Sequence, residues 1–362
     1  MRALVIASLI FSACFVALEA QAREKTEFYT GVRMLGMGGV SVAIANDETA
    51  VFSNPAALGK LRDPFITVVD PEVHYGADTS SFLTGFDLNV LGVKSLLEKI
   101  NDHPGRNLHI KMQLFPSVVV PNFAAGVLIK YDINGALDST NSEIDLNYTN
   151  DFAGVLGYNL RLFDGRLKIG FSGRYINRSQ ITDSNPIPTT NLDLTLKDIA
   201  QNGGAIAADA GIMITMPWAT LPTLAVTGRD LGNTSFGLGA GFASGTGERP
   251  TTVKQTVDGA IAFHPILGNR TRMTISFEMR DVMSTDADDK ADIYRRLHGG
   301  LEINLGDIFF VRGGMNQRYW TAGLEFTMAN FQFQVASYGE EIGTAAVHQE
   351  DRRYIGKFAY RF

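Results

Sequence analysis

The sequence predicts an all-β protein, an outer-membrane β-barrel of about fourteen antiparallel strands. Three observations predict this fold: many strand-length segments with period-two patterning, connections that alternate between short and long, and a last strand with one apolar, mostly aromatic face and one cationic face. No apolar run after the N-terminus approaches the length of a membrane helix. Since only helices and closed barrels satisfy the backbone in lipid, a membrane protein of this kind should be a barrel.

The first 22 residues have the three parts of a secretory signal peptide. Arg2 supplies the positive charge, residues 3–18 are apolar, and Ala20-Gln-Ala22 forms a cleavage site. A lipobox-like match around Cys14 is the alternative, but it is loose and apolar sequence continues past the cysteine. We therefore expect export through the inner membrane, cleavage before Arg23 and an outer-membrane location.

Composition excludes several classes of protein. Cys14 is the only cysteine, so the mature chain has no disulfide and no thiolate metal site. The net charge of −6 does not suggest binding to nucleic acid. The 37 glycines suit strands that twist and turn tightly.

About fourteen segments show period-two alternation. In residues 353–362 one face is apolar and mostly aromatic while the other carries three cations, as expected for a lipid face and a lumen face. A soluble sandwich that buries the apolar face is the alternative, and twelve strands is the alternative count, because the first segment is short and contains Pro64. The expected strands are 64–70, 111–120, 122–132, 151–163, 166–177, 204–216, 222–231, 255–264, 271–281, 296–305, 307–315, 318–328, 330–339 and 352–362.

The connections give an independent signal. Links after the even-numbered segments are short, and those after the odd-numbered segments are mostly long, with Asn316-Gln317 as the exception. Short periplasmic turns and long outer loops are the layout of bacterial outer-membrane barrels. A soluble sandwich has no reason for this asymmetry. The expected long loops are 71–110, 133–150, 178–203, 232–254, 282–295 and 340–351.

One amphipathic helix is expected within the first long loop, from Phe86 to Ile100. Its apolar side chains fall roughly on one stripe, with most charges off that stripe. The sequence leaves its role open: it caps the barrel mouth, lines a ligand groove, touches the outer leaflet, or is simply an ordered part of the loop.

Two blocks carry a resemblance to a known family. Residues 31–58 contain the run Leu35-Gly-Met-Gly-Gly39, then an acidic position at Asp47 and an Asn-Pro-Ala-x-Leu motif ending at Leu58. This stretch resembles the N-terminal signature of the long-chain fatty-acid transporter (FadL-like) superfamily. A second block, residues 297–323, resembles the C-terminal half of its PorV/TraF-like branch.

The resemblance implies both a fold and a function. In the family the N-terminal segment is a plug inside the barrel, here residues 23–62, followed by a barrel over residues 63–362. The implied function is passive transport of hydrophobic small molecules, such as long-chain fatty acids, with sideways release into the membrane. A PorV-like structural barrel that anchors or shuttles partner proteins is the alternative, and a hydrophilic porin ranks third. The expected plug or gate residues are Gly36, Gly38, Gly39, Asp47, Asn54, Pro55, Ala56 and Leu58.

Charged residues on the polar strand faces are expected to point into the lumen. They form a polar pathway or a set of contacts that hold the plug, or else a filled, mutually neutralised interior. They are Lys168, Arg174, Glu278, Arg280, Glu302, Glu325, Lys357 and Arg361.

The end of the chain and the loops predict partners. By resemblance, Tyr360 and Phe362 form the signal that the barrel assembly machinery reads. The other expected partners are outer-membrane lipid, lipopolysaccharide and a hydrophobic small molecule.

No covalent chemistry is expected. The glycines of residues 36–39 lack the spacing of a phosphate-binding loop, and no nucleophile motif or catalytic triad is evident. The six histidines lack metal-ligand spacing. An acidic patch at residues 286–292 is either a divalent-cation site or a solvated loop. We expect no enzyme activity, no cofactor and no metal.

Overall fold

A computed structural model describes residue 24 and residues 27–82, 92–137, 142–182, 186–239, 241, 245–268 and 270–362. The expected signal peptide, residues 1–22, and the first part of the expected helix lie outside the described residues. Within the described part of the chain, no helix is both long enough and apolar enough to cross a membrane.

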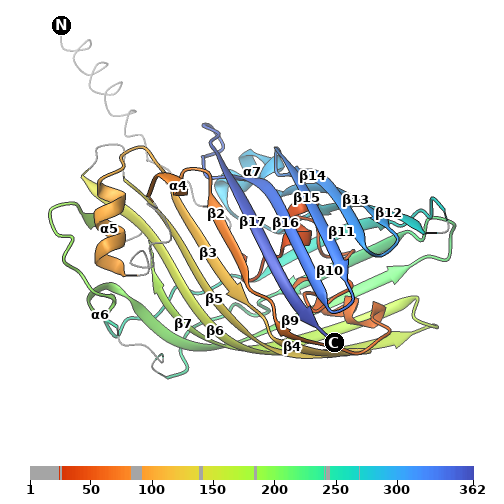
Figure 1. Cartoon of the computed structure of the whole chain (residues 1–362). Coiled ribbons are helices and arrows are strands. Elements are labelled where there is room, and N and C mark those ends of the chain that lie inside the picture. The colour runs from red at the N-terminus through yellow and green to blue at the C-terminus, as the bar shows by residue number, and fades with distance from the viewer. Residues whose placement is uncertain are drawn as a thin grey trace, which may run out of the picture.

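The described strands form one closed antiparallel sheet (Figure 1). The strands are β1 (Phe65–Val69), β2 (Glu72–Gly76), β3 (Leu108–Leu114), β4 (Ser117–Val120), β5 (Phe123–Leu137), β6 (Glu143–Leu162), β7 (Leu167–Ile181), β8 (Ile187–Pro188), β9 (Gln201–Thr215), β10 (Thr223–Arg229), β11 (Thr256–Phe263), β12 (Thr271–Met279), β13 (Leu297–Leu305), β14 (Phe309–Asn316), β15 (Tyr319–Met328), β16 (Phe331–Glu341) and β17 (Glu350–Arg361). The short helices are α2 (Val32–Gly36), α3 (Ala50–Ser53), η1 (Pro55–Lys60), α4 (Thr79–Phe82), α5 (Val93–Asn101), α6 (Leu196–Ile199), α7 (Ala287–Ala291) and η3 (Ile293–Arg296).

The barrel wall has fourteen strands. β1 and β2 are two parts of the first wall strand, β3 and β4 are two parts of the second, and β8 only extends the edge of β6. The barrel closes where β1 pairs with β17, with Thr67 opposite Arg361. The predicted fold class is therefore confirmed, and the twelve-strand count and the soluble sandwich are excluded.

Side chains alternate across the wall as the sequence indicates. In β7, Phe171 and Tyr175 are exposed on the outer surface, whereas Ser172 and Arg174 are buried inside. The same alternation in the other strands gives the barrel an apolar outer surface around a polar and charged interior.

Two expectations about the strands were wrong. The first wall strand does not end before Pro71, because it resumes as β2 after a break. The expected loop 133–150 is mostly strand, since β5 and β6 extend over residues 133–137 and 143–150. Outward apolar side chains in these extensions, such as Ile133 and Leu146, are covered by α5. This cover explains why β5 and β6 continue as strands beyond the residues expected from the sequence.

Helix α5 lies against the outer surface of the barrel, at the end of these extended strands (Figure 1). It buries Leu96, Leu97 and Ile100 against the outward side chains of β3, β5 and β6. Gly135 leaves room for Ile100, whose Cδ1 atom would lie 2.6 Å from a Cβ at that position. The helix therefore thickens the wall from outside and does not cap the mouth.

The first two wall strands are both broken by proline. β1 pairs with β4 on one side of the break, and β2 pairs with β3 on the other. Because Pro71 and Pro116 have no N–H to donate, the ladder cannot continue through them. The Asp70 carboxylate accepts a hydrogen bond from the Phe115 backbone N–H at 2.6 Å and so bridges the gap.

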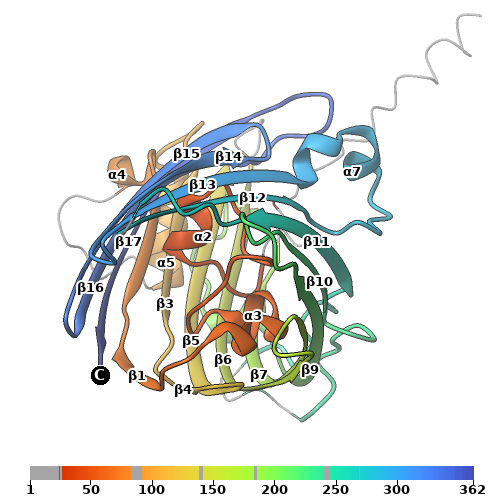
Figure 2. The ribbon, with the colours of Figure 1, turned by 90° about the vertical axis from the view of Figure 1, so that its right-hand side faces the viewer.

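Residues 27–61, here called the N-terminal segment, lie inside the barrel (Figure 2). Helix α2 packs on β14, β15, β16 and β17, and η1 packs on β6, β7 and β9. The segment contributes more than half of the large apolar cluster in the interior, from Tyr29 to Leu61. The lumen is therefore filled at this level by the chain's own N-terminal residues.

Candidate functional site

The glycine-rich run of the N-terminal segment fits against glycines of the wall. Gly38 has a φ of +72°, and a Cβ on it would overlap the carbonyl oxygen of Gly299. A Cβ on Gly300 would likewise overlap the Met37 carbonyl, and Gly36 lies against Gly323. The two sequence blocks that carry the family resemblance therefore pack directly against each other, which we call the first glycine contact.

The Asn-Pro-Ala motif fits against a different part of the wall in the same way. A Cβ on Gly170 would overlap the Pro55 backbone, and one on Gly211 would overlap the Asn54 side chain. Asn54 is fully buried, donates to the Val42 carbonyl at 3.0 Å and accepts from the Ala56 N–H at 3.0 Å. This second glycine contact holds the other end of the segment.

The remaining expected plug residues lie between or beside these contacts. Asp47 accepts a hydrogen bond from the Thr49 N–H at 3.0 Å, and Leu58 is fully buried beside Gly157. Gly39, at a φ of +89°, lies against His298. The eight residues expected to form the plug are thus distributed over one segment that touches several wall strands.

The expected lumen residues lie inside the barrel, and most of them bind the N-terminal segment. Glu278 accepts from the backbone N–H groups of Ser41 and Val42, at 2.7 and 2.8 Å. Glu302 pairs with Arg33 at 2.8 Å.

The others pair with one another or with the segment. Arg312, which the sequence did not single out, links Glu302 to Glu325. Lys357 and Arg361 both pair with Glu48. Lys168 donates to the Gly165 carbonyl, and Arg174 pairs with Asp209 and Asp230. Contacts that hold the segment and wall charges that neutralise one another therefore occur together in the lumen.

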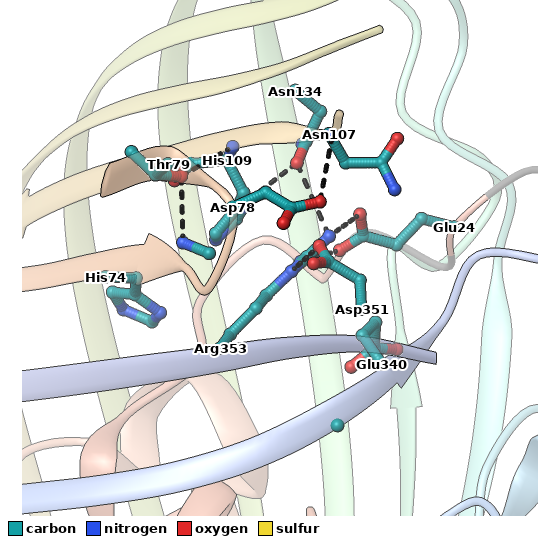
Figure 3. Close-up of polar contacts among 12 residues, drawn as sticks. Glu24, His74, Asp78, Thr79, Asn107, His109, Asn134, Glu340, Asp351 and Arg353 are labelled. Atoms are coloured by element: carbon teal, nitrogen blue, oxygen red, sulfur yellow. Dashed lines mark hydrogen bonds and ion pairs between the residues drawn. The ribbon is translucent and has the colours of Figure 1, made fainter. Parts of the chain in front are cut away.

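The beginning of the described chain is attached differently from the rest. Glu24 forms a bidentate ion pair with Arg353, whose two Nη atoms lie 2.6 and 2.8 Å from the carboxylate oxygens (Figure 3). Glu27 pairs with Arg280 at 2.7 Å and with Arg229 at 3.2 Å. Among the described residues, no glycine of the barrel wall packs against this part of the chain, residue 24 and residues 27–30, which we call the entry stretch. Sequence reasoning missed it, and the signal that could have found it was two acidic residues soon after the expected signal peptide.

The charges of the entry stretch set its response to pH. Burial alone would raise the pKa of Glu24, but Arg353 outweighs it and lowers that pKa from 4.5 to about 2. The pKa of Glu27 is likewise lowered, because Arg280 and Arg229 outweigh its burial. A carboxylate with a lowered pKa stabilises the docked form above its ordinary pKa and loses that contribution as pH falls toward the lowered value.

We therefore expect the entry stretch to loosen between about pH 4.5 and pH 2 and to stay docked from pH 5 to 8. Conductance of the protein in planar bilayers should rise over that acid window. The double variant Glu24→Gln, Glu27→Gln should give the higher conductance already at pH 7. If the variant and the unmodified protein conduct equally at pH 7, the ion pairs do not hold this stretch closed.

A cavity of about 380 Å³ lies beside the entry stretch at the long-loop end of the lumen. Phe28, Phe52, Ile176 and Val253 contribute its apolar lining. Most of the rest is polar or charged, in contrast to the apolar tunnel expected of a hydrophobic channel. The size is within the range of small-molecule sites.

An apolar groove of about 890 Å³ lies on the outer surface, across β1, β4, β5, β6, β7 and β9. Its floor includes Gly154 and Gly173, at which an added Cβ would meet no atom within 4 Å. Pro116 at the broken strand lies at one side of the groove. The groove and the cavity share Arg174 and therefore lie on opposite sides of the same part of the wall.

Aromatic rings connect the cavity to the strand break. Phe28 lies 5.9 Å from Phe52, and Phe52 lies 4.7 Å from Phe115 in an edge-on arrangement. Phe115 is 1% exposed and fills the interruption beside Pro116 from the lumen side. Phe115 is thus the ring between the interior aromatic residues and the outer groove, a role that its sequence position did not reveal.

The acidic patch at residues 286–292 is used for local structure. Asp286 caps α7 by accepting from the N–H groups of Asp288 and Asp289. Asp292 pairs with Arg318, and Asp289 accepts from the Ser284 hydroxyl. Across the described residues, no group of three or more histidine or acidic side chains could hold a metal ion.

Comparison with known proteins supports the fold. The sequence matches no family model and no curated protein. The CymD monoaromatic hydrocarbon channel has a TM-score of 0.52, with 91% of this chain and 96% of that chain covered at 10% identity. The toluene transporter TbuX of Ralstonia pickettii has a TM-score of 0.50, with 92% and 98% covered at 12% identity. At these identities the likeness concerns the fold alone and does not distinguish the PorV/TraF-like branch. The chain has the fold of these two proteins, a closed antiparallel β-barrel of fourteen wall strands.

Proposed function

We propose that this protein is an outer-membrane barrel through which small molecules with an apolar body diffuse passively. A solute enters the cavity at the long-loop end, passes the aromatic rings of Phe28, Phe52 and Phe115, and leaves through the strand break into the outer groove. One observation supports this route. The cavity and the aromatic rings lie on the lumen side of the strand break at Pro116, and the groove lies on its outer side. The two solved structures with the same fold are a monoaromatic hydrocarbon channel and a toluene transporter.

The N-terminal segment has two roles in this proposal. Its part from Gly36 to Leu58 is a fixed plug. At the two glycine contacts the segment backbone lies so close to the wall that it could move only if the two backbones separated. The gate is the entry stretch, which ion pairs hold and which lines the cavity through Glu27, Phe28 and Tyr29. Closure therefore depends on the residues that precede the family motif.

The proposal includes the location of the barrel. The apolar outer side chains, such as Leu156 and Phe333, would face lipid, and the long loops would face lipopolysaccharide. Phe362 is 62% exposed at the closing strand pair, where its backbone bonds that of Ile66. With Tyr360, it would be accessible to the barrel assembly machinery before the barrel closes.

A second candidate function is a structural barrel without an open path, whose loops bind partner proteins. It is favoured by the same glycine contacts and by the charged lining of the cavity, which would make passage of a pure hydrocarbon costly.

Uptake of a small apolar solute into vesicles that contain the full mature chain separates the two functions. If the protein is a transporter, uptake should be well above that of protein-free vesicles. If it is a structural barrel, uptake should equal that of protein-free vesicles.

A further inference from the structure

Nearly half of the residues that line the cavity are charged, and this restricts what can bind there. Among the described residues, seven basic and six acidic side chains line it. A hydrocarbon that filled the space would remove these charges from water without a hydrogen bond in return. The occupant should therefore carry a polar or charged group of its own.

One wall of the cavity presents cations in particular. Lys130, Arg174 and Arg178, from β5 and β7, all line the cavity. Two of the carboxylates that pair with them are buried in the wall behind: Asp151 is 0% exposed and Asp209 is 2% exposed. The cations therefore lie between these acids and the cavity, an arrangement that attracts an anion.

An apolar surface lies directly beside this basic wall. The Arg174 guanidinium carbon is 4.6 Å from the centre of the Phe28 ring, and the Lys130 ammonium is 5.2 Å from it. Ile176, on the same strand face as Arg174 and Arg178, also lines the cavity. A ligand with its charged end at the cations would thus place an attached ring or short chain on apolar side chains.

We propose that the cavity binds a small organic acid. Its carboxylate faces Lys130, Arg174 and Arg178, and its aromatic or short alkyl body packs on Phe28 and Ile176. The volume of about 380 Å³ suits a body of about one ring. This inference rests on the proposed function, in which the cavity is the entry site for solute.

Binding of three matched ligands to the purified full mature chain in detergent tests the inference. Benzoate, benzyl alcohol and benzylamine share a ring and differ in charge. In isothermal titration calorimetry at pH 7.5, we expect benzoate to bind at least tenfold more tightly than the other two, and increasingly weakly as salt is added. Equal binding of benzoate and benzyl alcohol, or tighter binding of benzylamine, would overturn the proposal without any variant.

A single substitution locates the site. Arg178→Gln removes one cation from the wall, and Asp151 keeps its ion pair with Lys130 at 3.1 Å, so no carboxylate loses its only cation. We expect the benzoate preference to fall at least tenfold in this variant. Arg352→Gln, which removes a cation stacked on Trp320 at 3.9 Å on the outer side, should leave it unchanged. An unchanged preference in Arg178→Gln would place the anion elsewhere and contradict the assignment.

Vesicle uptake of the same three compounds separates this inference from the proposed function. Selective benzoate binding without uptake of any compound contradicts transport and leaves the binding site standing. Uptake of benzyl alcohol at the rate of benzoate, with no selective binding, contradicts only the organic-acid assignment.

Discussion

Replacing Gly38 by alanine is expected to cost about 2–5 kcal/mol of the free energy of unfolding. The new Cβ would overlap the Gly299 carbonyl, so the first glycine contact must open, and overpacking of this kind costs about 1–3 kcal/mol. The φ of +72° adds about 1–2 kcal/mol for any residue with a Cβ. Urea unfolding in lipid vesicles, followed by the fluorescence of the two tryptophans, measures the change.

Gly105 provides a matched control. Its φ of +73° equals that of Gly38, but an added Cβ would meet nothing within 4 Å. Gly105→Ala should therefore show only the backbone cost, about 1–2 kcal/mol. Equal losses in the two variants would mean that the glycine contact itself contributes little and that the segment is not held there.

Replacing Phe115 by alanine is expected to open the proposed route and to weaken the barrel. Loss of a buried phenylalanine costs about 3–5 kcal/mol of the free energy of unfolding. The same change removes the ring between the interior aromatic residues and the outer groove. Uptake of a small apolar solute into vesicles should rise several-fold.

Phe333→Ala controls for a general loosening of the barrel. This ring is 49% exposed on the outer surface and contacts Phe358 there, away from the break. Its removal should leave uptake unchanged. If Phe115→Ala raises uptake no more than Phe333→Ala does, solute does not pass through the strand break.

The sequence predicts the barrel well because its signal is local. The alternation in β7 and β17 and the positions of the tight turns depend on residues close together in the chain. The sequence predicts the strand breaks only in part. Pro71 indicates the end of a strand, because nothing local shows that Asp70 bridges to Phe115, 45 positions later.

The site could be predicted only in part, because its contacts join distant residues. The glycines at 36–39 indicate close packing, but their partners in β13 and β15 lie more than 250 positions away. The Glu24–Arg353 pair spans 329 positions. Alternation showed that Arg353 faces inward, but not which acid it meets. The resemblance places the gate within residues 36–58, whereas we propose the entry stretch before it, because ion pairs and no wall glycines hold that stretch among the described residues.

Crosslinking the entry stretch to the wall tests most directly whether solute passes it. The mature chain expected after cleavage has no cysteine, so Glu27→Cys with Arg229→Cys introduces one reactive pair at an existing ion pair. Uptake of a small apolar solute is measured in the same vesicles before and after treatment with a short bismaleimide. We predict clear uptake before crosslinking and its loss afterwards. Uptake that is equal before and after, or absent in both, would contradict passage through this gate.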